Sequence, residues 1–177
     1  MINTYNYLEK IYMKKIKTRL RDKNFLLEKD LECLSQPFNP LGITNQELLS
    51  LFERAWIMLK SEEVVDALRS FTFLCHLEPH LPEAWYGLGL SLEGNGLFEE
   101  AVSAFLVAET LDPTRFEFYE HSIECCLELY NTHEARHILN RLLRHKKTVE
   151  AFPSHKKALT RLDRRIEALE HKRKVSE

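Results

Sequence analysis

A period of 34 residues is the feature that most constrains how this sequence can fold. Alanines recur at that spacing, a large apolar side chain follows each alanine four positions later, and two prolines share the period: Ala67, Ala101 and Ala135; Phe71, Phe105 and Leu139; Pro79 and Pro113. A period of this length is typical of stacked supersecondary units, each of which buries its apolar face against the next. The sequence therefore predicts a repeat protein.

The central unit, residues 82–115, carries the fullest pattern. Its residues match the positions of the tetratricopeptide signature, a pair of antiparallel helices: Trp85, Leu88, Gly89, Leu92, Ala101, Phe105, Ala108 and Pro113. Small Gly89 and Ala101 allow the two backbones to approach, and Gly94-Asn95-Gly96 provides a turn that tolerates positive φ. We therefore expect one helix pair per repeat, with repeats at 48–81, 82–115 and 116–149.

The flanks of the repeats are also interpretable. Thr44 with Glu47 predicts a capping box, and Ile43 with Leu48 a hydrophobic staple. Upstream, we expect a helical or partly disordered segment and linker over 1–43, with a short amphipathic helix around Leu27–Leu34. Downstream of Pro153, an apolar stripe predicts a capping helix within 150–177, formed by Leu159, Leu162, Ile166 and Leu169.

The predicted fold class is all-α: three tandem helix pairs over 44–149 in a right-handed superhelix, with an N-terminal helical segment and a C-terminal cap. Only five glycines and six prolines in 177 residues agree with helices. The four cysteines form no disulfide framework or zinc pattern, and no run of about 18 apolar residues occurs. We expect a cytoplasmic protein without stable membrane insertion.

Charge is unevenly distributed along the chain. Residues 1–24 hold seven bases against two acids, and residues 141–174 hold twelve against four. Residues 25–140 hold six bases against twenty acids, a net charge of −14. A nucleic-acid partner across the middle is therefore not expected, because phosphates would be repelled.

Counting along the repeat register predicts a concave peptide-binding groove. The first helix of each pair is expected to line it, which places apolar side chains there: Leu49, Phe52, Trp56, Leu59, Tyr86 and Leu90. An apolar trough suits an extended ligand that inserts alternate side chains. Some of these residues could instead contact the N-terminal helix or a second subunit.

An acidic stripe follows in the third repeat, at Glu117, Glu120, Glu124 and Glu128. Their spacing puts the carboxylates on one helix face. Two readings stay open: a solvated face, or a polar end of the groove that meets a basic ligand segment.

One string resembles a catalytic motif. His133-Glu134-Ala135-Arg136-His137 fits the HExxH zinc pattern, but Ala135 already belongs to the helix contact, and no third ligand is evident. Adjacent Cys125 and Cys126 point about 100° apart on a helix, so core packing is favoured over a metal or redox pair. We expect no enzyme activity, no cofactor and no metal.

In this arrangement of repeats and flanking helices, the sequence resembles the class II type III secretion chaperones of the SycD, LcrH and IpgC kind. The likeness covers roughly residues 30–172 and rests on AWYGLGLSLEGNGLFEEAVSAF (84–105) and RFEFYEHSIECCLELYNTHEA (115–135). It implies a chaperone that holds an extended segment of a hydrophobic translocator in its groove and keeps that client soluble and unassembled before export. Positions matching the family's groove residues are Phe52, Leu59, Val64, Trp85 and Phe98.

Self-association as a homodimer through the N-terminal helix and first repeat is also expected. Three alternatives remain: a tetratricopeptide scaffold or needle-subunit export chaperone, a metalloenzyme using His133 and His137, and a co-chaperone for an acidic tail. The last is disfavoured because Phe52 and Trp56 stand where carboxylate-gripping residues would be needed.

Overall fold

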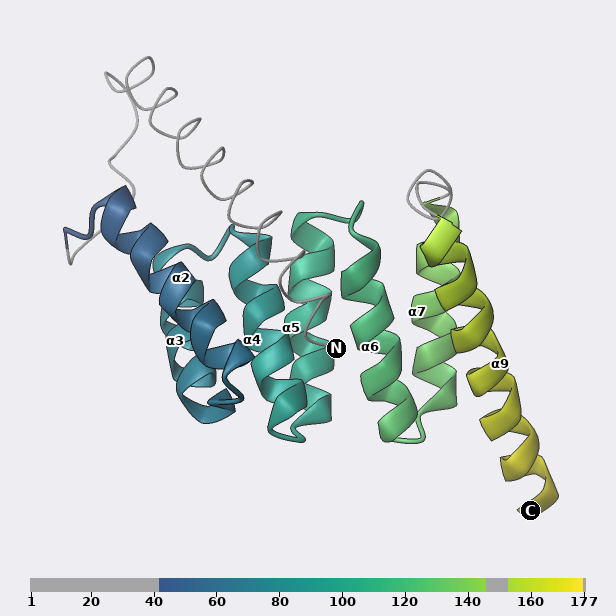
Figure 1. The fold of residues 1–177 in the computed structure, drawn as a ribbon. Helices are drawn as coiled ribbons and strands as arrows, with labels where there is room; N and C mark the ends of the chain where they lie inside the picture. The colour runs from purple at the N-terminus through teal and green to yellow at the C-terminus, as the bar shows by residue number, and fades with distance from the viewer. Residues whose placement is uncertain (1–41, 146–152, 177) are drawn as a thin grey trace.

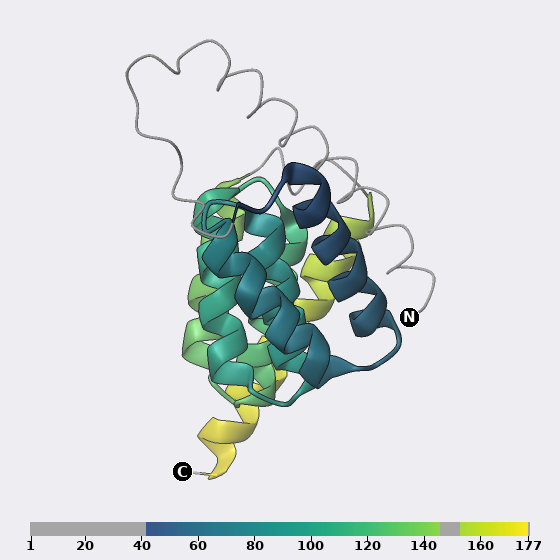
Figure 2. The same ribbon diagram turned by 90° about the vertical axis from the view of Figure 1, so that its left-hand side faces the viewer.

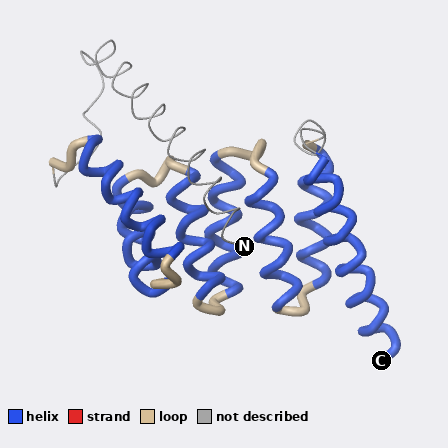
Figure 3. The backbone as a smooth tube through the Cα atoms, in the orientation of Figure 1, coloured by secondary structure: helices blue, strands red, loops and turns tan. Residues whose placement is uncertain are grey.

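The computed structural model describes residues 42–145 and 153–176, with side chains as far as Lys172. Within those ranges the chain is helical and contains no strand (Figure 3). The predictions made for residues 1–41, including the Leu27–Leu34 helix, and for the end of the third repeat at Lys147 lie outside the described residues.

Three helix pairs stand side by side and a longer helix follows them (Figure 1). The helices are α2 (Asn45–Lys60), α3 (Val64–Leu77), α4 (Pro82–Gly94), α5 (Phe98–Leu111), α6 (Phe116–Glu128), α7 (Thr132–Arg144) and α9 (Pro153–Ser176). Helices α3, α5 and α7 begin 34 residues apart, as do α4 and α6. The all-α repeat fold predicted from the sequence is confirmed.

Helix α2 departs from that register by beginning three residues early, at Asn45 instead of 48. The cause is its cap. The Thr44 side chain accepts a hydrogen bond from the Glu47 backbone, and Glu47 Oε2 accepts one from the Thr44 backbone at 2.8 Å. The predicted capping box is thus present, and it satisfies amides that the start of a helix leaves open.

The helices form two layers, which Figure 2 shows along the stack from its α2 end. Helices α2, α4 and α6, the first of each pair, contact one another in sequence; we call them the first-helix layer. Helices α3, α5 and α7 form the second layer. The first-helix layer is the one that the sequence analysis expects to line a groove.

Two glycines of α4 allow the layers to approach. A Cβ atom on Gly87 would lie 2.1 Å from the Phe71 ring, and one on Gly89 would lie 2.4 Å from the Phe105 ring. Both distances are far inside van der Waals contact, so only glycine fits under these rings. The role predicted for Gly89 is confirmed, and Gly87 plays the same part against the preceding repeat.

The turns inside the three helix pairs share one backbone feature. Glu62, Gly96 and Tyr130 all have positive φ, at 61°, 75° and 55°, and they lie 34 residues apart. Of the predicted Gly94-Asn95-Gly96 turn, only Gly96 takes this conformation, because Gly94 still belongs to α4 and Asn95 has a φ of −89°. The outer repeats adopt the same turn without glycine.

Helix α9 closes the end of the stack. Leu162 and Ile166 are fully buried, Leu159 is nearly so, and Leu169 packs against the same cluster. Their partners come from α6 and α7, among them Ile123, Leu127 and Leu139. The apolar stripe predicted downstream of Pro153 therefore forms the expected cap.

Candidate peptide-binding face

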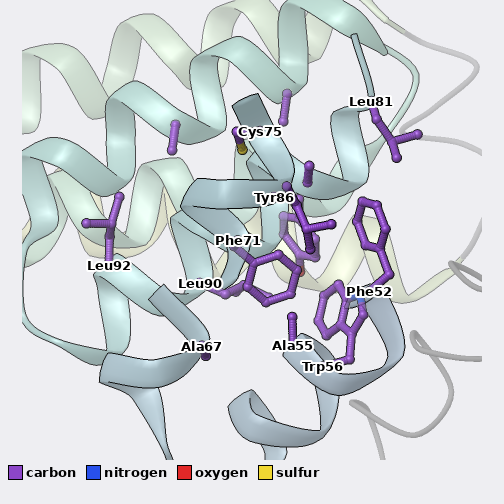
Figure 4. Close-up of a cluster of buried hydrophobic side chains, with 14 of the residues drawn as sticks. Phe52, Ala55, Trp56, Ala67, Phe71, Cys75, Leu81, Tyr86, Leu90 and Leu92 are labelled. Carbon is purple, nitrogen blue, oxygen red and sulfur yellow. The ribbon is translucent and has the colours of Figure 1, made fainter. Parts of the chain in front are cut away.

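A row of aromatic rings crosses the first-helix layer from the first repeat to the third. Trp56 of α2 lies 6.3 Å from Tyr86 of α4, measured between ring centroids, and Tyr86 lies 5.1 Å from Phe118 of α6. Phe71 and Phe105 of the second layer pack against this row at 5.3 Å from Trp56 and 5.8 Å from Tyr86. Figure 4 shows Trp56 and Phe52 reaching from α2 toward Tyr86 and Phe71. The row joins the first two repeats and Phe118 of the third in one buried cluster, whereas most of the third repeat packs with α9 in a second cluster.

The structure brings most of the predicted groove residues into this core. Phe52, Trp56 and Tyr86 are at most 1% exposed, and Leu49 and Leu90 are 9% and 5% exposed. These five side chains were expected to line an open groove, but in this structure they are buried. The physical reason is that Trp56 and Tyr86 pack on each other and on Phe71 and Phe105 of the second layer, inside the stack. A role in peptide contact stays a prediction for these residues.

The other predicted groove residues are partly exposed: Leu59, Val64, Trp85 and Phe98. Leu59, Trp85 and Phe98 pack against the edge of the same core. Trp85 turns toward the α3–α4 connection, where its Nε1 donates a hydrogen bond to the Pro79 carbonyl at 2.8 Å. Val64 and Phe98 are the first residues of α3 and α5. Leu59, near the end of α2, and Trp85 of α4 are the members of this group that belong to the first-helix layer.

A polar pair that the sequence analysis missed lies at the end of the aromatic row. His121 Nδ1 of α6 lies 2.8 Å from Glu93 Oε2 of α4, and both side chains are 28% exposed. The His121 ring packs against Tyr86 and Phe105, with centroids 5.7 Å and 5.6 Å away. This pair presents polar groups beside the apolar row. Its partners are 28 residues apart, so no local motif announces it.

The acidic stripe of α6 meets basic side chains of this same chain. Arg161 of α9 lies 3.0 Å from Glu120 and 2.9 Å from Glu124, and Arg165 pairs with Glu124 and Glu128. Glu117 lies 3.5 Å from Arg115. The sequence left open whether this stripe is solvated or meets a basic segment. In the structure it pairs with a basic segment of the same chain, α9. A role of the stripe toward a ligand stays a prediction.

A second set of ion pairs fixes α9 on its other side. Arg136 of α7 pairs with Asp163 and Glu170, the latter at 3.2 Å. Hydrogen bonding to Glu170 raises the pKa of Arg136. The cap is therefore held by an apolar stripe between two groups of charge pairs.

The candidate metal and thiol residues lie as helix geometry predicts. Ala135 is fully buried, whereas His133 and His137 are exposed on α7. Within residues 42–145 and 153–172, no cluster of three His, Cys, Asp or Glu side chains is suitably arranged for a metal ion. Cys125 and Cys126 are buried free thiols, and burial raises the pKa of Cys126 to about 11. Such a thiol is protonated at neutral pH and is a poor nucleophile.

Searches of sequence leave the chain without a match: no protein-family model matches it, and no curated protein does. None of the described helices is long and apolar enough to cross a membrane.

Solved structures do match, and they define the class of fold. The chain is similar to PcrH in complex with the chaperone binding region of PopD, with a TM-score of 0.64 and 23% identity over 75% of this chain and 97% of that one. It is also similar to the type III secretion chaperone SycD of Yersinia enterocolitica in complex with a peptide of the translocator YopD, with a TM-score of 0.64 and 24% identity over 75% and 98%.

A further structure of SycD, described as an alternative dimer, matches with a TM-score of 0.63 and 24% identity over 75% of this chain and 98% of that one. The chain thus has the all-α, tetratricopeptide-type fold of PcrH and SycD.

Proposed function

We propose that this chain is a cytoplasmic class II type III secretion chaperone. It binds an extended segment of a hydrophobic translocator protein and keeps that protein soluble and unassembled before export. The observation that carries the proposal is the likeness to SycD and PcrH over three quarters of this chain and nearly all of theirs. The SycD structure holds a peptide of the translocator YopD, and the PcrH structure holds a segment of PopD.

The partner segment is proposed to lie along the first-helix layer. The row from Trp56 through Tyr86 to Phe118 gives this layer a rigid apolar interior, and Leu59 and the His121–Glu93 pair lie at its partly exposed margin. An extended peptide contacts such a surface through alternate side chains and hydrogen bonds to polar margins. Binding, without chemistry, is the function that this arrangement supports; the neighbouring structures are chaperones.

Self-association is proposed to use the first repeat. Ile57 of α2 and Val65 of α3, in the first helix pair that the structure describes, are 55% and 49% exposed. Exposed apolar side chains at one end of a repeat array favour a subunit contact, and SycD has been solved as a dimer. Sedimentation of the Ile57→Glu, Val65→Glu double variant tests this: a dimer that becomes a monomer supports the contact, and a wild-type monomer at micromolar concentration contradicts it.

The variants that test client binding must leave the fold intact. Phe52 and Leu90 are poor choices, because an introduced glutamate would be desolvated in the core whether or not a client were present. Leu59→Glu places the charge at the partly exposed end of α2. Leu106→Glu is a matched control, since Leu106 is 41% exposed on α5 in the second layer.

The experiment is co-expression of the tagged chain with translocator candidates from its own genome, read as the soluble fraction of each candidate. The proposal predicts that one candidate becomes soluble and co-purifies, that Leu59→Glu abolishes this, and that Leu106→Glu does not. Equal effects of the two variants at equal helical content, or capture of soluble assembly proteins only, would favour the scaffold alternative.

A further inference from the structure

One face of α9 collects cations that the fold leaves available. Lys156, Lys157, Arg161, Arg164 and Arg165 line an open cavity of 770 Å³ that begins at Pro153. At 100° per residue these side chains centre roughly opposite the buried stripe of Leu159, Leu162, Ile166 and Leu169. We call this set of five cations the α9 basic face. A terminal helix needs only a polar outer surface for solubility. Solubility alone therefore does not explain why five cations share one face.

The glutamates of α6 engage only one side of this face. Arg161 and Arg165 pair with Glu120, Glu124 and Glu128, which orients the two guanidinium groups at the border between α9 and the first-helix layer. Lys156, Lys157 and Arg164 are exposed and make no ion pair with any residue of 42–145 or 153–172. A second negatively charged group therefore has three cations available to it beside two that are already positioned.

The length of the face limits what can occupy it. From Lys156 to Arg165 the helix rises about 14 Å, which matches about four residues of extended chain. Carboxylates border the face, because Glu167 follows on the next turn and the glutamates of α6 flank the side, before the chain turns basic again at Lys172. A long polyanion such as a nucleic acid would run onto these carboxylates and be repelled. A short run of carboxylates fits within the cations.

We propose that the α9 basic face binds a short, extended acidic segment of a partner protein, of about four residues. The carboxylates contact Lys156, Lys157 and Arg164 directly, with Arg161 and Arg165 as the edge of the site. The assignment goes beyond the proposed chaperone function and does not depend on it, because it requires no ligand on the first-helix layer.

The test is fluorescence anisotropy of a fluorescein-labelled hexaglutamate peptide titrated with the full chain. Exposed ion pairs of this kind are weak and screened, so a Kd on the order of 100 μM is expected at about 50 mM salt, and it should rise steeply at about 300 mM salt. Hexaglutamine with the same label is the uncharged control, and a short oligouridine of six phosphates tests nucleic acid.

A matched pair of double variants locates the binding. Lys157→Glu with Arg164→Glu reverses two cations of the α9 basic face. Arg54→Glu with Arg144→Glu makes the same change in net charge at two exposed positions on α2 and α7. We expect the first pair to weaken peptide binding about 10-fold or more, and the second less than about twofold.

Three results would overturn the assignment: no binding of hexaglutamate at millimolar protein, equal weakening by both variant pairs, or tighter binding of the oligouridine than of the peptide. Failure here is separable from failure of the chaperone proposal, because hexaglutamate has no apolar side chains for the first-helix layer and Leu59→Glu should not alter its binding.

Discussion

The ring of Tyr86 lies 5.1 Å from the ring of Phe118, and this contact links the first helix of the second repeat to the first helix of the third. Both side chains are fully buried. Through Trp56 on one side and Phe118 on the other, Tyr86 links the first helices of all three repeats. The first-helix layer is therefore expected to unfold as a unit.

That coupling can be measured. Phe118→Ala removes a fully buried ring and should lower the free energy of unfolding by about 3–5 kcal/mol. A double-mutant cycle of Tyr86→Leu and Phe118→Leu should give a coupling energy of about 0.5–1.5 kcal/mol beyond the loss of buried area. Urea unfolding followed by circular dichroism checks both values; additive effects of the two leucines would mean that the rings contribute only as separate apolar groups.

Gly87→Ala should destabilise the protein, although helix propensity alone would favour alanine. Alanine is the better helix former by about 1 kcal/mol, yet its Cβ would lie 2.1 Å from the Phe71 ring. Overpacking of this kind costs about 1–3 kcal/mol, so Gly87→Ala should lower the melting temperature. Ser103→Ala, at an exposed position of α5, is the control and should leave it unchanged or slightly higher. A rise for Gly87→Ala would show that the ring moves aside at little cost.

The positive φ at Tyr130 predicts a stabilising substitution. A non-glycine residue pays about 1–2 kcal/mol for the left-handed conformation, and Tyr130 is 76% exposed, so its ring contributes little packing. Tyr130→Gly should therefore raise the free energy of unfolding by up to about 1 kcal/mol after the entropy cost of glycine. Gly96→Ala, at the equivalent turn of the second repeat, should lower it. Differential scanning calorimetry decides, and a loss of stability in Tyr130→Gly would contradict the strain argument.

The α2 cap predicts a pH dependence. Hydrogen bonds from the Thr44 backbone and side chain lower the pKa of Glu47. A carboxyl whose folded pKa lies below its unfolded value stabilises the fold above the unfolded value and loses that contribution as pH falls through the folded pKa. Thr44→Ala should return the Glu47 pKa toward its ordinary range, which an NMR titration of the side-chain carboxyl would detect. An unchanged pKa would show that the cap does not set it.

The repeat period predicted which segments are helical. The spacing of the apolar residues within each repeat marks the buried face of each helix, and this can be counted along the sequence. The period also predicted the glycine under Phe105, and a spacing of three and four residues predicted the apolar stripe of α9. The repeat period did not predict that the side chains of Phe52, Trp56 and Tyr86 are buried. A residue count assigns a face to the first-helix layer, but whether that face is open depends on how closely neighbouring first helices approach, and this is set by three-dimensional packing.

Pairing between distant segments was similarly out of reach. Glu124 and Arg165 are 41 residues apart, and Glu93 and His121 are 28 apart. The acidic stripe on α6 is visible in the sequence, and so is the basic helix after Pro153. That the two meet follows from the position at which the apolar stripe seats α9, which neither charge pattern contains.

The most direct measurement is hydrogen–deuterium exchange of the purified chain with and without a candidate translocator segment. If the chain is a translocator chaperone, a bound segment should slow exchange in α2, α4 and α6, the first-helix layer, and leave exchange in α3, α5 and α7 nearly unchanged. Slowing confined to the second layer, or no change with any translocator segment of its own genome, would contradict the proposal that this chain is a translocator chaperone.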